Sequence, residues 1–185
     1  LLSLTAISGE FPTSQLNRLP ASPYYLEAVV TALKKAGLLR TYYRDRLRGY
    51  RLGIKAKSAL LDGWPERFTF CLTGDAETNR LKSEANRRFR LHRLAETYIT
   101  MGNAGVLLYP DEKPKVFAQT GFGGETVTYP AFYSSREVKE LGADATQIRS
   151  SRFAGVLLVP TGIFVTYNSG SAPVSYTHLT LPTIR

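Results

Sequence analysis

The chain has 185 residues, enough for one large domain or two small ones. Its 43% hydrophobic and 11% aromatic content excludes a disordered protein, and no apolar run approaches the roughly 20 residues of a membrane-spanning helix. The 24 Lys and Arg exceed the 15 Asp and Glu and give a net charge of +9. This excess favours a polyanionic partner, nucleic acid before an anionic membrane, although a basic protein without such a partner has the same composition.

The cysteine content predicts a reduced, cytoplasmic protein. Cys71 is the only cysteine, so the chain has no disulfide framework and no thiolate metal site. No signal peptide is recognisable, and we expect no membrane partner. Because the chain opens on Leu1 without Met, the natural start is expected to lie upstream.

The first third predicts helices followed by a hairpin. Residues 1–7 are compatible with a helix, and Thr13 or Ser14 is expected to cap a second helix that ends near Leu19. A third helix has the clearest signals: Ser22 as cap, then Pro23, with Gly37 as terminator. Its predicted buried stripe is Leu26, Val29, Val30 and Leu33, and its predicted outer face is Tyr24, Ala28, Thr31 and Lys35.

After Gly37 the residue pattern predicts two strands, 38–44 and 49–54, with Gly49 at the turn and a short helix over 55–63. The hairpin is rich in arginine, interleaved with Tyr42, Tyr43 and Tyr50. Its arginines are Arg40, Arg44, Arg46, Arg48 and Arg51. Three helices and a basic hairpin within residues 1–64 predict a winged helix-turn-helix domain.

The remainder predicts a small mixed α/β domain over residues 76–172, so the expected fold class is α+β. The expected elements are a strand over Arg67–Leu72, a helix over 76–102, strands over 104–110 and 129–133, a short helix over 134–142 and a hairpin over 152–170 that turns at 160–162.

The basic hairpin and the outer helix face predict binding to double-stranded DNA. Hairpin arginines can neutralise phosphates or enter the minor groove, and polar residues of a helix in the major groove can contact base edges. The predicted contacts are Tyr24, Ala28, Thr31, Lys35, Arg40, Arg44, Arg46, Arg48 and Arg51. Alternatively, the domain mediates protein contacts, and the arginines are solvated and protect an edge strand from aggregation.

The basic half of the long helix, around 87–93, extends the predicted DNA contacts with Arg87 and Arg88, or is a solvated face. The segment TGFGGE at 120–125 lacks the Lys-Ser/Thr of a phosphate loop and is expected to be a link. His92 and Cys71 are expected to be buried structural residues. The pattern predicts no catalytic residue, metal site or cofactor, and Glu96, Glu137 and Lys139 have no spacing that indicates chemistry.

GLLRTYYRDRLRGYRL, FRLHRLAETYITMGNAGVLLYPDEKP and the late hairpin resemble the replication-relaxation family of plasmids and integrative conjugative elements. The resemblance covers most of residues 1–172 and implies a winged helix followed by a domain similar to the PD-(D/E)xK nuclease fold. It implies that His92 matches a family histidine. It also implies an Asp where this chain has Phe153 and Ala154, and acidic residues where it has Thr166, Tyr167 and Asn168. A metal-dependent nuclease needs clustered carboxylates, so this departure favours recognition or assembly at DNA over catalysis.

Residues 174–185 resemble the translation of a sequencing-library adapter, with Pro173 at the junction, so residues 173–185 are expected to be non-native. The sequence thus predicts a DNA-binding protein of a mobile element, active in plasmid or conjugative-element replication or transfer, with protein partners of such a complex. Two alternatives stay open: a metal-dependent nuclease or nickase whose catalytic residues follow this segment, and a winged-helix transcriptional regulator.

Overall fold

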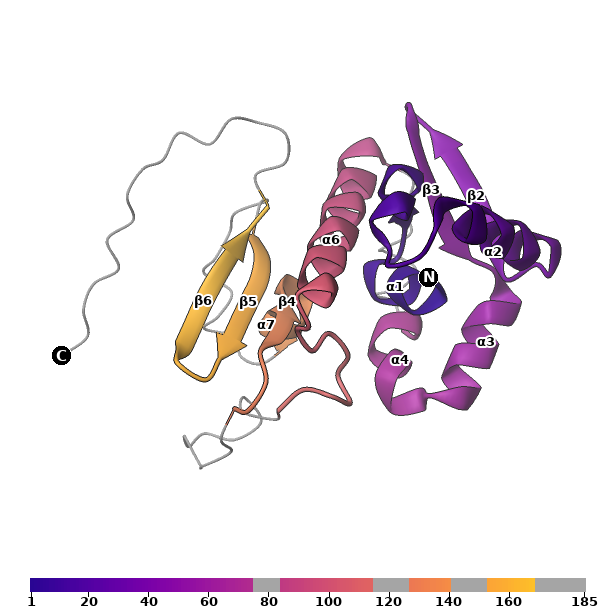
Figure 1. Cartoon of the computed structure of the whole chain (residues 1–185). Helices are drawn as coiled ribbons and strands as arrows, with labels where there is room; N and C mark the ends of the chain where they lie inside the picture. The colour runs from indigo at the N-terminus through magenta and orange to yellow at the C-terminus, as the bar shows by residue number, and fades with distance from the viewer. Residues whose placement is uncertain (75–83, 115–126, 141–152, 169–185) are drawn as a thin grey trace.

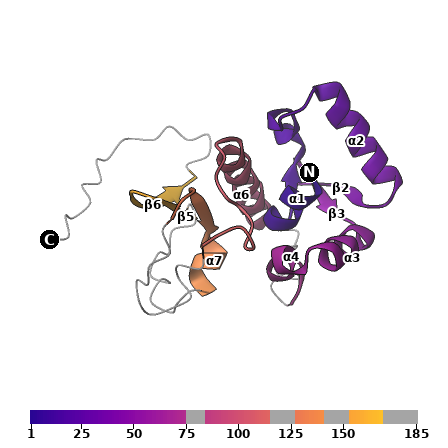
Figure 2. The ribbon, with the colours of Figure 1, turned by 60° about the horizontal axis from the view of Figure 1, so that its bottom comes forward.

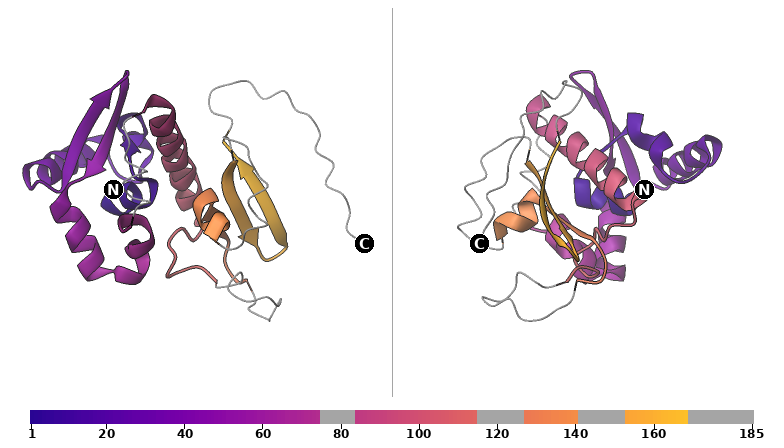
Figure 3. Two further views of the ribbon diagram at one scale, coloured as in Figure 1. Left: turned by 180° about the vertical axis from the view of Figure 1, so that it is seen from behind. Right: turned by 60° about the vertical axis from the view of Figure 1, so that its left-hand side comes forward.

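The computed structural model describes residues 1–74, 84–114, 127–140 and 153–168 of the chain. Within these ranges the fold is α+β, as predicted, with two small antiparallel sheets of three strands each (Figure 1). Helix α6 (Ala85–Asn103) lies between the two sheets and contacts both (Figures 1 and 3). The segments 76–83 and 120–125 and the tail, for which a helix, a link and a non-native end are predicted, lie outside the described residues.

The N-terminal half is a sequence of short helices interrupted by one antiparallel sheet. Its elements are α1 (Leu2–Ser8), β1 (Phe11–Pro12), the 3-10 helix η1 (Thr13–Arg18), α2 (Pro23–Lys35), β2 (Leu39–Arg44), β3 (Leu47–Leu52), α3 (Ile54–Gly63) and α4 (Pro65–Leu72). The strand order is β1-β3-β2, so β3 is central and the two-residue β1 covers only part of its length.

Helix α2 follows the sequence prediction closely. The Ser22 hydroxyl accepts a hydrogen bond from the Tyr25 amide at 3.3 Å, Pro23 is the first helical residue, and Gly37 follows the helix end with a φ of 70°. Leu26 and Val30 are buried by contact with the sheet and η1, because they recur with the helical period on one face.

The helix predicted near residue 13 is the 3-10 helix η1, and neither predicted cap is used. Pro12 occupies the cap position without a side-chain hydrogen bond, and the Thr13 hydroxyl instead donates to the Arg48 carbonyl at 3.3 Å. This bond connects the start of η1 to strand β3 and gives the Thr13 hydroxyl a hydrogen-bond partner outside its own helix.

The hairpin prediction is confirmed, but its turn lies earlier than predicted. Residues Asp45 and Arg46 form a two-residue turn with φ of 52° and 60°, the combination that a type I′ turn requires. Gly49 is instead inside β3, where a Cβ atom would lie 2.4 Å from Glu10 Oε1. Glycine is needed at this position because a buried carboxylate approaches the backbone closely.

The predicted strand over Arg67–Leu72 is wrong, since these residues belong to helix α4. Phe68, Cys71 and Leu72 recur at the helical spacing and are all buried, while Pro65 begins the helix. The predicted strand over 104–110 is also not a strand: in the described chain it contributes one isolated bridge, between Leu107 and Ala131.

The C-terminal part consists of β4 (Ala131–Ser134), α7 (Ser135–Glu140), β5 (Phe153–Val159) and β6 (Gly162–Tyr167), with the strand order β4-β5-β6. The predicted strand near 131, the short helix and the late hairpin are confirmed. Each face of β4 contacts a different hydrophobic cluster. Phe132 packs into the larger cluster with α6, and Tyr133 packs into a smaller cluster that includes Val138 of α7. The larger cluster extends from α1 to β5 and so continues across the predicted domain boundary at residues 64–76. Over the described residues, no helix has both the length and the apolar character to cross a membrane.

Candidate nucleic-acid interface

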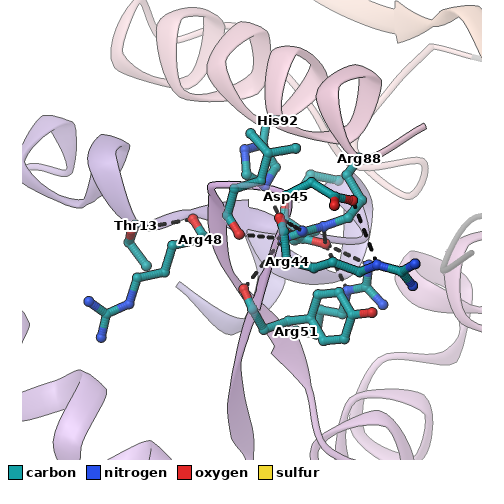
Figure 4. Close-up of polar contacts among 11 residues, drawn as sticks. Thr13, Arg44, Asp45, Arg48, Arg51, Arg88 and His92 are labelled. Atoms are coloured by element: carbon teal, nitrogen blue, oxygen red, sulfur yellow. Dashed lines mark hydrogen bonds and ion pairs between the residues drawn. The ribbon is translucent and has the colours of Figure 1, made fainter. Parts of the chain in front are cut away.

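A buried carboxylate organises the base of the hairpin. Glu10, fully buried between α1 and β1, accepts a hydrogen bond from Arg51 Nε at 2.7 Å and from His92 Nε2 at 2.8 Å. Arg88 Nη2 lies 2.5 Å from Glu10 Oε1, and Arg88 Nε lies 3.1 Å from both carboxylate oxygens. We call these four residues the Glu10 cluster; Figure 4 labels Arg51, Arg88 and His92. This cluster joins three segments that are distant in sequence: the start of β1, strand β3 and helix α6.

The surroundings of Glu10 stabilise its ionised form. Burial alone raises the pKa of a carboxyl group, but hydrogen bonds from His92, Arg88 and Arg51, together with the charge of Arg51, outweigh burial and lower the pKa of Glu10 from 4.5 to about 2. Because an ionised carboxylate only accepts hydrogen bonds, His92 Nε2 must carry a hydrogen in this arrangement. His92 is hydrogen-bonded, as expected, but its side chain is 13% exposed, so it is partly rather than fully buried. Cys71 is buried in the core, as expected.

Arg51 and Arg88 are predicted as DNA contacts, and their placement requires a correction. Arg88 is fully buried and Arg51 is 8% exposed, and both guanidinium groups pair with Glu10. Both also lie against the ring of Tyr42, with the Arg51 guanidinium carbon 4.0 Å from the ring centroid. Phosphate contact by either side chain would need it to leave a buried ion pair, which is strongly unfavourable. We therefore remove Arg51 and Arg88 from the predicted contact surface.

The other hairpin arginines are exposed: Arg44, Arg46 and Arg48 lie at or beside the turn, and Arg40 lies near the base of the hairpin. We call β2, β3 and their turn, residues 39–52, the basic ribbon. Side-chain alternation and the register place Arg40 and Arg44 on one face of the basic ribbon, whereas Tyr43 and Arg48 form a cross-strand pair on the other. Arg46 lies at the turn between the two faces. Tyr43 is 68% exposed, so an aromatic ring lies beside Arg48 in solvent. Both faces near the turn therefore offer cations, as a ribbon between two phosphate backbones requires.

The outer face of α2 is also exposed as predicted: Tyr24, Ala28, Thr31 and Lys35 all face solvent. Tyr24 is 85% exposed and the neighbouring Tyr25 is 61% exposed, although large aromatic side chains are usually mostly buried. Figure 2 shows α2 at the outside of the molecule, on the side of the N-terminal sheet away from α6. Helix α2 and the basic ribbon are therefore both exposed in this half.

The basic half of α6 is divided between interior and surface. Arg88 is inside, as described above, whereas Arg90 is exposed and Arg87 is partly exposed. Arg93 is partly exposed, and its carbonyl accepts a hydrogen bond from Asn168 at 3.0 Å. The first turns of α6 therefore lie beside the turn of the basic ribbon, where Arg88 Nη1 donates to the Arg44 carbonyl at 2.7 Å.

Two further ion pairs serve the fold. Lys113 is 7% exposed and pairs with Glu137, whose other oxygen accepts hydrogen bonds from the amide and the hydroxyl of Ser134 at the start of α7. Arg67 pairs with Asp111 and connects α4 to the segment after α6. Over residues 1–74, 84–114, 127–140 and 153–168, no group of three or more His, Cys, Asp or Glu is placed to hold a metal ion.

Replacing Arg46 with glycine should stabilise the protein. A non-glycine residue at positive φ costs about 1–2 kcal/mol, part of which glycine loses again through its greater flexibility when unfolded, so we expect a gain of roughly 0.5–1 kcal/mol. Thermal unfolding of Arg46→Gly measures this gain. Arg46→Gln is the matched control, because it removes the charge but keeps the strained φ; equal stability of the two variants would contradict the prediction.

Comparison of the chain with protein-family models, with curated protein sequences and with solved structures gives no match. The resemblance to the replication-relaxation family therefore stays a prediction.

Proposed function

We propose that this protein binds double-stranded DNA through the basic ribbon and the outer face of α2. In this proposal the N-terminal half is a winged helix-turn-helix, with η1 and α2 as the helix pair and the basic ribbon as the wing. The element order helix, strand, helix, helix, hairpin supports this assignment, as does the sheet order β1-β3-β2, which attaches the wing to the strand between the first two helices.

The observation that carries the proposal is the exposure of four arginines on a projecting hairpin. Arg40, Arg44, Arg46 and Arg48 are all exposed, and within the basic ribbon the only acidic residue is Asp45, whose Oδ2 lies 3.6 Å from Arg44 Nε. Both partners of this pair are about half exposed, so solvent screens the pair and breaking this one contact costs little. Phosphate contacts by such side chains provide affinity and orientation, and base contacts would come from α2.

The residues on α2 suit a helix that lies in the major groove. Thr31 can donate or accept a hydrogen bond, Lys35 can contact a guanine edge or a phosphate, and Ala28 can contact a thymine methyl group. Tyr24 is placed near the helix start, where a hydroxyl can reach a phosphate. Exposure of all four side chains supports this use of the helix.

Fluorescence anisotropy tests the proposal. The protein is titrated into a short fluorescein-labelled duplex at several salt concentrations between about 50 and about 200 mM. Since each phosphate contact contributes about −0.9 to the slope of log K against log salt, four ribbon contacts predict a slope of about −3.6 or steeper. Absence of binding at the lowest salt concentration, or binding that does not depend on salt, would refute the proposal.

The proposed cellular role rests on fewer observations than the proposed DNA binding. A function in replication or transfer of a plasmid or conjugative element, with protein partners in that complex, rests on the family resemblance alone. We include no catalytic step in the proposal, because residues 153–168, where the resemblance implies an acidic hairpin, contain no Asp or Glu.

A further inference from the structure

The outer part of the basic ribbon lacks a third strand. Strand β1 pairs with β3 only through Phe11 with Tyr50 and Pro12 with Gly49. From Arg48 to the turn, the basic ribbon has two strands, and its turn contains two residues at positive φ. A two-stranded hairpin is marginally stable in water, so this part needs support from another element if its arginines are to keep a fixed position.

Besides the Thr13 hydroxyl, which donates to the Arg48 carbonyl at 3.3 Å, helix α6 gives that support through a single side chain. Arg88 Nη1 donates to the Arg44 carbonyl at 2.7 Å, and Nη2 donates to the Leu47 carbonyl at 3.0 Å and to the Tyr42 carbonyl at 3.3 Å. These three carbonyls lie on both strands and flank the turn. The guanidinium group therefore joins the two strands at the position where β1 no longer pairs with β3.

The orientation of Arg88 is itself fixed. Its Nε contacts both oxygens of Glu10, and the Tyr42 ring centroid lies 4.7 Å from its guanidinium carbon. The side chain is fully buried, so it has one arrangement and little freedom to adopt others. Only arginine has five N–H donors in a rigid plane, whereas lysine has three donors on one atom. Lysine therefore cannot donate hydrogen bonds to Glu10 and to the carbonyls of both strands at the same time.

We propose that Arg88 is a positioning residue for DNA binding: it fixes the turn of the basic ribbon on α6, so that the exposed arginines are held in a binding-ready arrangement. This inference rests on the proposed function for its DNA part and on the hydrogen bonds alone for its structural part. Pre-organisation of this kind raises affinity because less freedom is lost when the complex forms.

The variant Arg88→Lys tests the proposal, since it keeps the charge but loses the planar set of donors. We expect duplex affinity to fall about tenfold while the salt slope stays within about one unit of the wild-type slope, because no phosphate-contacting charge is removed. Amide hydrogen exchange at Arg44 and Leu47, the hydrogen-bonded pair that closes the turn, should become at least about tenfold faster, with exchange in α2 unchanged. Arg90→Lys, the same change at an exposed position of the same helix, is the control. If Arg88→Lys matches this control in affinity and in exchange, the proposal is wrong.

A second comparison covers the case in which Arg88→Lys does not fold, as judged by circular dichroism. Glu10→Gln is then compared with the double variant Glu10→Gln, Arg88→Gln, which removes the carbonyl contacts without leaving a buried carboxylate unpaired. Faster exchange at the ribbon turn in the double variant supports the proposal, and equal exchange in the two overturns it. If the wild-type protein does not bind duplex DNA, the proposed function fails, while the exchange measurement still decides whether Arg88 positions the ribbon.

Discussion

Replacing Glu10 with alanine should destabilise the protein by about 3–5 kcal/mol, because it leaves the guanidinium groups of Arg51 and Arg88 buried without a counter-charge. The free energy of unfolding of a typical domain is only about 5–15 kcal/mol, so this single change should remove a large share of it. Urea unfolding followed by circular dichroism measures the loss. Glu27→Ala is the control: Glu27 is an exposed glutamate of α2, and we expect its replacement to change stability by no more than about 0.5 kcal/mol.

The same carboxylate should make stability depend on pH in the acidic range. The pKa of Glu10 is lowered to about 2 in the folded protein and has its ordinary value of 4.5 when unfolded. A lowered pKa stabilises the folded state at pH values above 4.5, and this contribution is lost as the pH falls from 4.5 towards 2. The size of the contribution is about 3 kcal/mol, since one pKa unit corresponds to about 1.36 kcal/mol.

The variant Glu10→Gln isolates this contribution from that of the other carboxylates. The difference in unfolding free energy between wild type and Glu10→Gln should be largest near about pH 6 and should shrink by about 3 kcal/mol towards about pH 2. Both proteins are measured in the same buffers at equal ionic strength, because salt screens exposed pairs more than this buried one. A difference that stays constant over this range would show that Glu10 is not held ionised by its neighbours.

Elements whose signals are local could be predicted from the sequence. The cap, the first-turn proline and the terminating glycine of α2 act within a few residues of the helix ends, so Ser22, Pro23 and Gly37 were sufficient to place it. The late hairpin is similar, because Gly162 immediately follows the two-residue turn between apolar strands. In both cases the structure that forms is the one preferred by the residues themselves.

The error at α4 has a different origin. In residues 67–72 both an alternating pattern, through Phe68, Phe70 and Leu72, and a helical pattern, through Phe68, Cys71 and Leu72, are present in one short apolar run. Tertiary packing decides between them, since Phe68, Cys71 and Leu72 together fill the core beside α1 and α6. A run of this length does not contain enough residues to separate the two periods.

The burial of Arg51 and Arg88 could not be predicted from the sequence, because it depends on a partner far along the chain. Glu10 is 41 residues from Arg51 and 78 residues from Arg88. Glu10 stands alone between two segments with turn-forming residues, and no pattern in a single sequence marks it as buried. Side-chain alternation gave one usable signal: Arg40, Tyr42 and Arg44 lie on one face of β2, which shows that the hairpin arginines do not form one row.

Replacing Arg40, Arg44, Arg46 and Arg48 together with glutamine should have the largest effect on DNA binding. All four side chains are exposed, so their removal should leave the fold intact, with each change within about 0.5 kcal/mol in stability. Loss of four phosphate contacts should flatten the slope of log K against log salt by about 3.6. Affinity at about 0.1 M salt should fall by roughly a thousandfold, because the release of counterions from the duplex is the main source of such binding.

The matched control removes cations on other elements. Lys55 of α3 and Lys139 of α7 are exposed and lie outside α2 and the basic ribbon. The double variant Lys55→Gln, Lys139→Gln should change the salt slope by much less than one unit for each charge removed, since distant charges act only through the screened field of the whole protein. If the two variants change the slope equally for each charge, binding depends on net charge alone, and the basic ribbon is a solvated edge that protects the sheet from pairing with other chains.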